Sequence, residues 1–246
     1  MLSVKVISLN INGINDQIKQ IRLVSFLQEN AIDIAMIQEH NIKNLNKIKY
    51  LNQYYHLILN KSILLKGGTL IAINKKLPST IGCTYLHPTS RLTTGYLNLF
   101  NTKLYLVNVY APSGRSKENE REEFFEQELM QSLVTNTDNI LLAGDWNCIL
   151  SPRDSSSPEN SSISRNLKGI INNLNFKDII SAKKSKSEYT FYKDGYGARL
   201  DRIYISKLFP NIVNTATKPV YFSDHLGVLL ELKISSQIEV GRPHGS

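Results

Sequence analysis

The sequence lacks the features that mark membrane and secreted proteins. No stretch approaches the roughly 18 continuous apolar residues of a membrane-spanning helix. From Met1 the chain runs straight into a strand-like pattern, without the charged and then apolar segment of a secretory signal. We therefore expect a soluble protein that does not associate with a membrane.

Cysteine is scarce as well. Cys83 and Cys148 are the only two in 246 residues, too far apart to suggest a zinc site and too few for a disulfide framework. A reducing compartment fits this composition best. The chain is nevertheless long enough to bury a substantial core without disulfides or structural metal.

Two common catalytic signatures are missing. Gly67 and Gly68 are not followed by the Lys-Ser or Lys-Thr of a phosphate-binding loop, which argues against nucleoside triphosphate binding. There is no Gly-x-Ser-x-Gly motif, which argues against a serine hydrolase. Together these two absences reduce the number of enzyme classes that the sequence fits.

The charge balance points weakly to a polyanionic partner. Lys and Arg outnumber Asp and Glu by 29 to 21, which gives a net charge of +8. Such a charge favours encounter with nucleic acid by long-range attraction. A modest positive balance also simply keeps a protein soluble, so charge alone does not decide the partner.

Apolar segments of strand and helix length alternate along the chain. Residues 4–9 and 31–37 have the continuous apolar character of buried strands. Between them, apolar residues every three positions predict a helix, capped by Asn15 or Asp16. Its predicted inner face consists of Ile18, Ile21, Val24 and Leu27.

The rest of the chain continues this alternation of strands and helices. Residues 55–59, 69–73, 96–100 and 104–109 predict a meander of short strands. Segment 118–134 predicts an amphipathic helix, and helical spacing returns at 163–174. The predicted inner face of the first of these helices consists of Phe124, Phe125, Leu129 and Leu133. Segment 151–164 is typical of a long surface loop. Further strands are predicted at 140–143, 212–217 and 228–234. Segments 190–192 and 199–205 are predicted to flank a glycine-containing hairpin tip at 193–197, whose lysine and tyrosine are expected to project into solvent.

Seven short polar clusters follow apolar segments and carry most of the candidate chemistry. Such clusters converge where strand ends meet at one edge of an open sheet, because rigid strands can direct many side chains into one cleft. They read L-N-I-N-G (9–13), I-Q-E (37–39), N-V-Y-A-P (108–112), G-D-W-N (144–147), Y-T-F (189–191), R-L-D-R-I-Y (199–204) and S-D-H (223–225).

Carboxylates and amides in these clusters suit phosphoester hydrolysis. Glu39 follows an apolar strand and offers the hard oxygen that Mg²⁺ prefers, although a strand-end charge is often merely solvated. Asp145 and Asn147 lie two residues apart and face the same way in an extended turn. The Asp145 carboxylate is able to accept a proton from water, and the Asn147 amide is able to donate a hydrogen bond to a phosphate oxygen. Trp146 is then expected to point into the core.

An acid-imidazole pair and a tyrosine complete the candidate set. Asp224 and His225 are adjacent, and a separate carboxylate such as Asp201 is able to fix the histidine tautomer and hold the ring charged toward phosphate. Tyr110 stands at the mouth of a constrained turn, where it donates to phosphate or serves packing alone. No role is assigned to the remaining histidines, which lack such an acidic neighbour.

The ordered set of clusters resembles the endonuclease/exonuclease/phosphatase superfamily over residues 4–234. Within it the chain is most similar to the apurinic-type endonuclease domain of LINE-type (non-LTR) retrotransposons. The resemblance implies an exonuclease III/DNase I-like α/β fold, a four-layer sandwich with two central mixed β-sheets. The domain would span residues 1–236, followed by a short tail at 237–246.

The resemblance also implies a role for each matching residue. Asn10 and Glu39 would bind the metal, Tyr110 would contact phosphate, Asp145 would activate water and Asn147 would position the scissile phosphate. Asp201 would orient His225, which stabilises the developing charge, and Asp224 would complete the leaving-group side. DNA contacts are expected from Asn12, Thr190, Lys193, Tyr196, Arg199 and Ser223.

The implied reaction is Mg²⁺-assisted nicking of double-stranded DNA, with Mn²⁺ as a possible substitute. It would leave a 3′ hydroxyl that primes reverse transcription by a reverse transcriptase fused in the same polyprotein. Synthesis would occur in the cytoplasm and action in the nucleus. Asn12 stands where repair relatives often have Asp, which puts strong abasic-site activity in doubt.

Three alternatives remain open at this point. A cellular AP endonuclease would cut abasic DNA in preference to intact duplex. A phosphatase of the same superfamily would act on inositol phosphates or lipid headgroups, for which positive charge also serves. A binding module without activity could keep the fold, but the complete set of acids, amides and imidazole argues against it.

Overall fold

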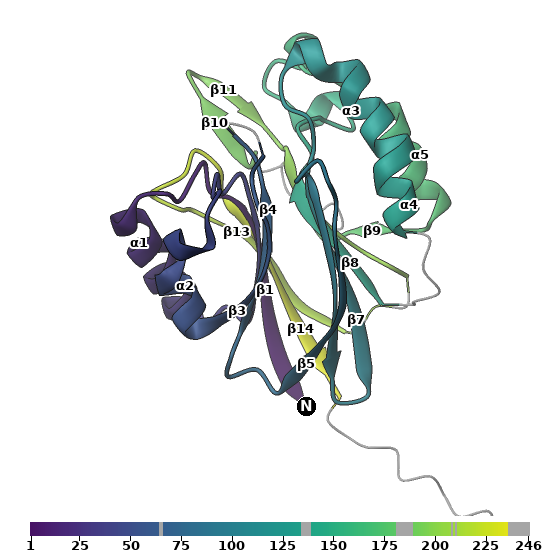
Figure 1. Ribbon diagram of the computed structural model, residues 1–246. Coiled ribbons are helices and arrows are strands. Elements are labelled where there is room, and N and C mark those ends of the chain that lie inside the picture. Colours follow the sequence, from purple (N-terminus) through teal and green to yellow (C-terminus); the bar gives the residue numbers. More distant parts are fainter. Residues whose placement is uncertain (64–65, 134–138, 181–188, 208, 210, 236–246) are drawn as a thin grey trace, which may run out of the picture.

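Two six-stranded sheets pack face to face and are covered on their outer faces by helices (Figure 1). The computed structural model describes residues 1–63, 66–133, 139–180, 189–207, 209 and 211–235. The predicted tail at 237–246 therefore lies outside the described residues.

The first sheet contains both ends of the described chain. Its strand order is β13-β14-β1-β2-β4-β3, and only β1 and β2 are parallel neighbours. Helices α1 (Gln17–Glu29) and α2 (Lys49–Tyr54) lie on its outer face (Figure 1). The strands are β1 (Leu2–Asn10), β2 (Ile34–Gln38), β3 (Tyr55–Asn60), β4 (Thr69–Asn74), β13 (Ile212–Lys218) and β14 (Gly227–Ile234).

The second sheet repeats this mixed arrangement with the central part of the chain. Its order is β5-β6-β7-β8-β12-β9, and only β7 and β8 are parallel. The strands are β5 (Ser79–Leu86), β6 (Leu92–Leu99), β7 (Thr102–Tyr110), β8 (Ile140–Asp145), β9 (Lys177–Asp178) and β12 (Asp201–Ile205). A separate hairpin is formed by β10 (Phe191–Lys193) and β11 (Tyr196–Ala198).

Helices of the central segment cover the second sheet. They are α3 (Glu118–Phe124), α4 (Met130–Leu133) and α5 (Arg165–Asn173), and a π-helical turn, Phe125–Leu129, joins the first two. The predicted inner face of this helical segment is confirmed, because Phe124, Phe125, Leu129 and Leu133 are all buried. The predicted loop at 151–164 contains only two short 3₁₀ turns.

Three apolar layers hold the four structural layers together. The first lies between the sheets and joins residues such as Val6 and Met36 to Leu106 and Leu141. The other two fill the space between each sheet and its helices. Burying one face of a helix and both faces of a sheet requires such stacking. The predicted four-layer α/β sandwich with two mixed sheets is therefore confirmed.

The structure corrects two details of the predicted fold. The expected meander is divided, because β3 and β4 belong to the first sheet, whereas β6 and β7 belong to the second, where β6 also pairs with the unpredicted β5. The inner face of α1 is also displaced. Val24 and Leu27 are buried as expected, but Ile18 is 60% exposed and Ile21 is 43% exposed, and Leu23 and Phe26 point inward instead.

Strand register brings the polar clusters to one edge of the sandwich. Asn10 pairs with Gln38 in the first sheet, and Asp145 pairs with both Tyr110 and Asp201 in the second. Near this edge a hydrogen bond joins the two sheets. Gln38 Nε2, on the first sheet, donates to Asn108 Oδ1, on the second, at 2.7 Å. A rigid platform therefore lies beneath the candidate site.

Candidate active site

The predicted catalytic residues meet at this single edge, although the strands deliver them in two ways. Asn10, Tyr110 and Asp145 end their strands, as expected. Asp201 instead begins β12, and His225 lies just before β14. Both strands run antiparallel to neighbours that end here, so their starts lie at the same edge. The expectation that every site residue follows a strand was wrong, but the convergence is real.

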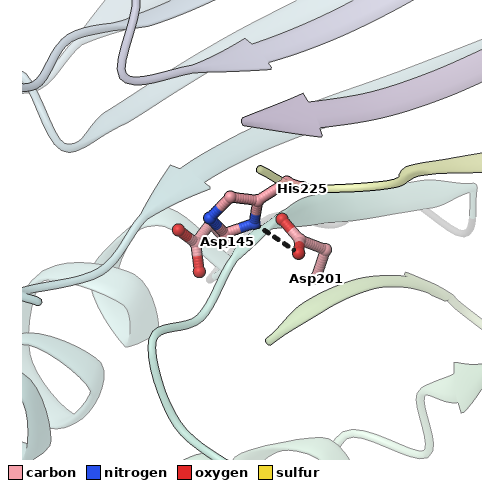
Figure 2. Close-up of side chains that lie close together, drawn as sticks. All are labelled: Asp145, Asp201 and His225. Atoms are coloured by element: carbon pink, nitrogen blue, oxygen red, sulfur yellow. Dashed lines mark hydrogen bonds and ion pairs between the residues drawn. The ribbon is translucent and has the colours of Figure 1, made fainter. Parts of the chain in front are cut away.

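An imidazole lies between two carboxylates at the centre of the site (Figure 2). His225 Nδ1 is 2.8 Å from Asp201 Oδ2, and candidate ligand atoms of these two residues and of Asp145 all lie within 4.8 Å of one another. All three residues are buried. The hydrogen bond to Asp201 places a proton on Nδ1 of His225. The other ring nitrogen is then left to interact with a substrate.

Asp201 shifts the proton affinity of His225. Burial by itself lowers the pKa of the imidazole, but the charge of Asp201 and the hydrogen bond from its carboxylate outweigh burial and raise the pKa to about 9. His225 is therefore an imidazolium at neutral pH. A buried positive charge at this position suits an anionic substrate.

Asp145 is held by two donors and is poised to change its protonation. Its Oδ2 accepts from Asn10 Nδ2 at 2.8 Å, and its Oδ1 accepts from the backbone N–H of Asn147 at 3.0 Å. Burial, followed by repulsion from Asp201, raises the pKa of Asp145 to about 7, and His225 opposes that rise. A carboxylate with a pKa near the working pH is suited to act as a general base.

Glu39 provides an unsatisfied oxygen beside these residues. Its Oε2 accepts from the Tyr110 hydroxyl at 2.9 Å, whereas its buried Oε1 has no hydrogen-bond partner among the described residues. The nearest cation is Lys66 Nζ at 3.5 Å, and that side chain is 72% exposed. A buried carboxylate oxygen that accepts no hydrogen bond and meets only an exposed lysine is poorly compensated, so Glu39 fits a divalent cation well.

Asn10 completes this donor set, because its Oδ1 accepts only the backbone N–H of Asn12, at 2.9 Å. The group of Asp145, Asp201 and His225 also has the composition of a metal site. Its imidazole, however, is a cation bonded to Asp201 and would repel a metal ion. Glu39 with Asn10 is the better metal-binding position.

A cavity of about 330 Å³ opens beside the catalytic groups. Asn147, Phe191 and His225 line it on the catalytic side, and Tyr196 and Ser161 line it farther away. Asn147 has a φ of 50° and donates through Nδ2 to Ala111 O at 2.9 Å, which turns the residue toward Asp145. Trp146 is fully buried, as predicted. Cys148, at the cavity wall, is buried, and burial raises its pKa to about 12, which keeps it an inert thiol.

Three residues expected to contact DNA are used inside the protein instead. Thr190 is buried, and its hydroxyl donates to Asp201 Oδ2 at 2.7 Å. Arg199 is buried in ion pairs with Asp178 and Asp154. The hydroxyl of Ser223 donates to Asn10 O at 2.7 Å. The family resemblance implied DNA contacts for these residues. Thr190 and Arg199 are buried and Ser223 is part-buried, and all three side chains bond to groups that support the site.

The remaining expected DNA contacts have different exposures. Asn12 is exposed and donates through Nδ2 to Asp224 Oδ1 at 3.4 Å, so both lie on the rim next to Glu39 and Asn10. Lys193 is exposed at the hairpin tip. Tyr196 does not project into solvent as predicted, because its hydroxyl lies 2.8 Å from Ser161 Oγ at the cavity wall.

Sequence reasoning missed a buried ion cluster under β12. Arg202 pairs with Asp154 at 3.1 Å and donates through Nη1 to Cys148 O at 3.1 Å, and Asp178 bridges Arg202 and Arg199. Such pairs are retained only when each charge is compensated. The two arginines flank Asp201 in the R-L-D-R motif, so the cluster anchors the strand that carries it. The motif contains the two arginines, but their acidic partners lie in distant segments, a 3₁₀ turn for Asp154 and strand β9 for Asp178.

Comparisons with known proteins agree with this geometry. A model of the Endonuclease/Exonuclease/phosphatase family matches residues 7–225. The chain is 24% identical, over 96% of its length, to the transposon TX1 uncharacterized 149 kDa protein of Xenopus laevis, and it spans 19% of that protein. In the described residues, no helix is both long and apolar enough to cross a membrane.

Solved structures share the fold at low sequence identity. An AP endonuclease from Archaeoglobus fulgidus matches with a TM-score of 0.78 and 21% identity, covering 94% of this chain and all of that one. The 3′ phosphatase NExo from Neisseria, bound to a product DNA hairpin, matches with a TM-score of 0.76 and 18% identity over 94% of this chain and 100% of that one. These likenesses concern the architecture.

Proposed function

Because the chain belongs to the Endonuclease/Exonuclease/phosphatase family, we propose that it is a divalent-metal-dependent endonuclease that nicks double-stranded DNA and leaves a 3′ hydroxyl and a 5′ phosphate. One observation carries the proposal. A buried Asp201–His225 pair, with 2.8 Å between Oδ2 and Nδ1, faces the base Asp145 beside Oε1 of Glu39, which has no hydrogen-bond partner among the described residues and only the exposed Lys66 as a nearby cation.

Each residue then has a chemical task. Asp145 removes a proton from the attacking water, and the phosphorus–3′ oxygen bond breaks as the new bond forms. His225, held as an imidazolium by Asp201, stabilises the charge that develops on the phosphoryl oxygens. Asn147 and Tyr110 orient the phosphate. A divalent cation at Glu39 and Asn10, Mg²⁺ or Mn²⁺, would supply positive charge toward the leaving oxygen.

We further propose that the chain acts as the target-site endonuclease of a non-LTR retrotransposon. The transposon relative, of which the chain spans 19%, supports this assignment. The chain would then be one part of a polyprotein that includes a reverse transcriptase, act in the nucleus, and provide the 3′ hydroxyl that primes copying. The net charge of +8 supports a DNA partner.

An AP endonuclease is the second candidate, and the cavity favours it. A sugar without its base fits a volume of about 330 Å³ beside Asn147 and His225. Matched duplexes with and without one abasic site separate the candidates. Faster nicking at the abasic site by orders of magnitude favours repair, whereas similar rates favour a target-site endonuclease.

Plasmid nicking tests the proposal itself. Wild-type protein with Mg²⁺ should convert supercoiled plasmid to the open circle, and chelation should stop it. Asp145→Asn and His225→Ala should abolish nicking, whereas His56→Ala, which alters an exposed histidine on β3, should not. Far-UV circular dichroism checks that the variants fold. Equal nicking by wild type and both site variants would overturn the assignment, and phosphate release without nicking would indicate a phosphatase.

The hairpin tip is the proposed source of site preference. Lys193, Asp194 and Gly195 are exposed at the end of β10 and β11, and the β-bridge between Phe191 and His225 joins the same hairpin to the site. Replacing the tip by a short turn should change the distribution of nicks mapped by sequencing. An unchanged distribution would show that the tip does not select the site.

A further inference from the structure

Tyr221 is an exposed aromatic side chain next to the catalytic loop. It is 73% exposed, more than any other aromatic residue in the described part of the chain. It lies in the turn between β13 and β14, three residues before Asp224. A single exposed tyrosine needs no explanation by itself. Tyr221 is informative because aromatic contacts hold its ring in place and because basic side chains lie beside it.

The ring is tied to the core by a chain of aromatic contacts. Tyr221 meets Phe222 with ring centroids 4.9 Å apart at 85°, and Phe222 meets the buried Phe26 at 6.0 Å and 90°. Edge-to-face contacts of this kind are favourable. The turn is also fastened to β1, because Ser223 Oγ donates to Asn10 O at 2.7 Å. The exposed ring is therefore held in place before any ligand arrives.

Cations of α1 accompany the ring. The guanidinium carbon of Arg22 lies 5.9 Å from the centroid of Tyr221. One turn earlier, Lys19 Nζ donates to Asn12 O at 3.0 Å, and Asn12 in turn contacts Asp224. An aromatic face flanked by basic side chains is the arrangement that binds unpaired nucleotides, with the base stacked and the phosphate near the cation.

We propose that Tyr221 and Arg22 form a stacking site for an unpaired nucleotide of the DNA substrate, on the Asn12 and Asp224 side of the scissile phosphate. This inference rests on the proposed DNA endonuclease function and adds a preference to it. A base within a duplex has both faces covered by its neighbours, so only an unpaired or frayed base can stack on Tyr221. The chain then favours nicking next to a single-stranded junction.

A protein partner is the competing occupant, because Ile18 and Ile21 are exposed on the same helix. Charge favours nucleic acid. Lys19 and Arg22 alternate with these isoleucines along α1, and the patch is continuous with the loop that carries His225. An isolated apolar docking face would not need two cations beside an aromatic ring.

The test compares a blunt duplex with the same duplex carrying a short single-stranded overhang that contains 2-aminopurine, whose fluorescence falls on stacking. Wild-type protein should bind the overhang DNA more tightly and quench the probe. Tyr221→Leu should weaken overhang binding about tenfold, change blunt-duplex binding less than twofold and abolish the quenching. Tyr221→Phe should retain all three properties, and Arg22→Gln should weaken overhang binding.

The control is Tyr54→Leu, which removes another exposed tyrosine at the end of α2, where β3 begins at the opposite edge of the sheet. It should behave as wild type. Equal losses on both DNAs, or no loss with Tyr221→Leu, would overturn the inference. So would a change in self-association by light scattering with unchanged DNA binding, which indicates a protein partner. If wild type nicks no plasmid, the proposed function itself fails; if it nicks and Tyr221→Leu discriminates nothing, only the stacking site fails.

Discussion

The interior of the site and its rim hold their polar side chains in different ways. Inside, Asp201, His225 and Asp145 are buried, and each forms hydrogen bonds to groups on other segments. On the rim, Asn12, Asp224, Lys66 and Lys193 are exposed or nearly so. Groups fixed before the substrate arrives stabilise charge without reorganising, whereas exposed groups adapt to a partner. Interior substitutions should therefore lower the rate of chemistry, and rim substitutions should weaken binding.

The largest expected effect comes from removing the charge of Asp201. Asp201→Asn keeps the shape of the side chain but removes the charge that holds His225 protonated. Nicking should slow by about 10²- to 10⁴-fold, the usual contribution of a positioned acid or base. The matched control is Asp33→Asn, a carboxylate far from the site that accepts the Lys5 backbone N–H at 2.8 Å. Slowing by both variants alike would contradict the assignment.

The next effect concerns the metal position. Glu39→Gln removes the carboxylate charge at Oε1, which accepts no hydrogen bond among the described residues, without changing the size of the side chain. The Mg²⁺ concentration that gives half-maximal nicking should rise at least tenfold, because a neutral amide binds Mg²⁺ more weakly than a carboxylate. Titrating Mg²⁺ against the initial rate measures this shift. An unchanged midpoint would place the metal elsewhere.

The pH profile should show both interior groups. Asp145 is active when deprotonated, so kcat/KM should rise with pH up to about 7, or lower if bound metal reduces its pKa. His225 is active when protonated, so kcat/KM should fall as pH rises through about 9. In Asp201→Asn the upper limb should move down toward about 6.5, the ordinary value for histidine. An upper limb that stays near 9 in that variant would contradict the pairing.

A smaller effect is expected from Thr190, a buried residue that supports the interior of the site. Its hydroxyl donates to Asp201 and accepts the backbone N–H groups of Leu200 and Asp201. Thr190→Val leaves these groups unsatisfied and should lower the free energy of unfolding by about 1–3 kcal/mol. It should also slow nicking with little change in DNA affinity, and Thr190→Ser should restore both properties. If Thr190→Val lowers only the affinity for DNA, and neither the stability nor the nicking rate, then Thr190 contacts DNA instead.

Much of the fold and of the interior of the site was predictable from the sequence. Buried strands and polar clusters at their ends are local patterns, so the four-layer sandwich and the convergence of Glu39, Asp145 and His225 were predicted from motif order. The hairpin was found from its glycine in the same way. Its second strand, however, is β11 (Tyr196–Ala198), whereas the predicted segment 199–205 contains β12 of the second sheet.

What sequence could not show depends on contacts between distant segments. The pairing of Arg199 and Arg202 with Asp154 and Asp178 joins segments that only the fold brings together. The displaced face of α1 has a similar cause, since a spacing of three fits two adjacent helix faces and the packing against the sheet selects one. Roles of short polar residues such as Thr190 depend on burial, which spacing does not give.

The most direct test of the difference between interior and rim measures two quantities on two variants. Single-turnover nicking gives the rate constant at saturating protein, and titration gives the Kd for DNA. Asp201→Asn should lower the rate constant by about 10²-fold or more with nearly unchanged Kd, whereas Lys193→Ala should raise Kd with nearly unchanged rate constant. If both variants change the rate constant, or both change the Kd, the account is contradicted, because the interior would then not serve chemistry and the rim would not serve DNA binding separately.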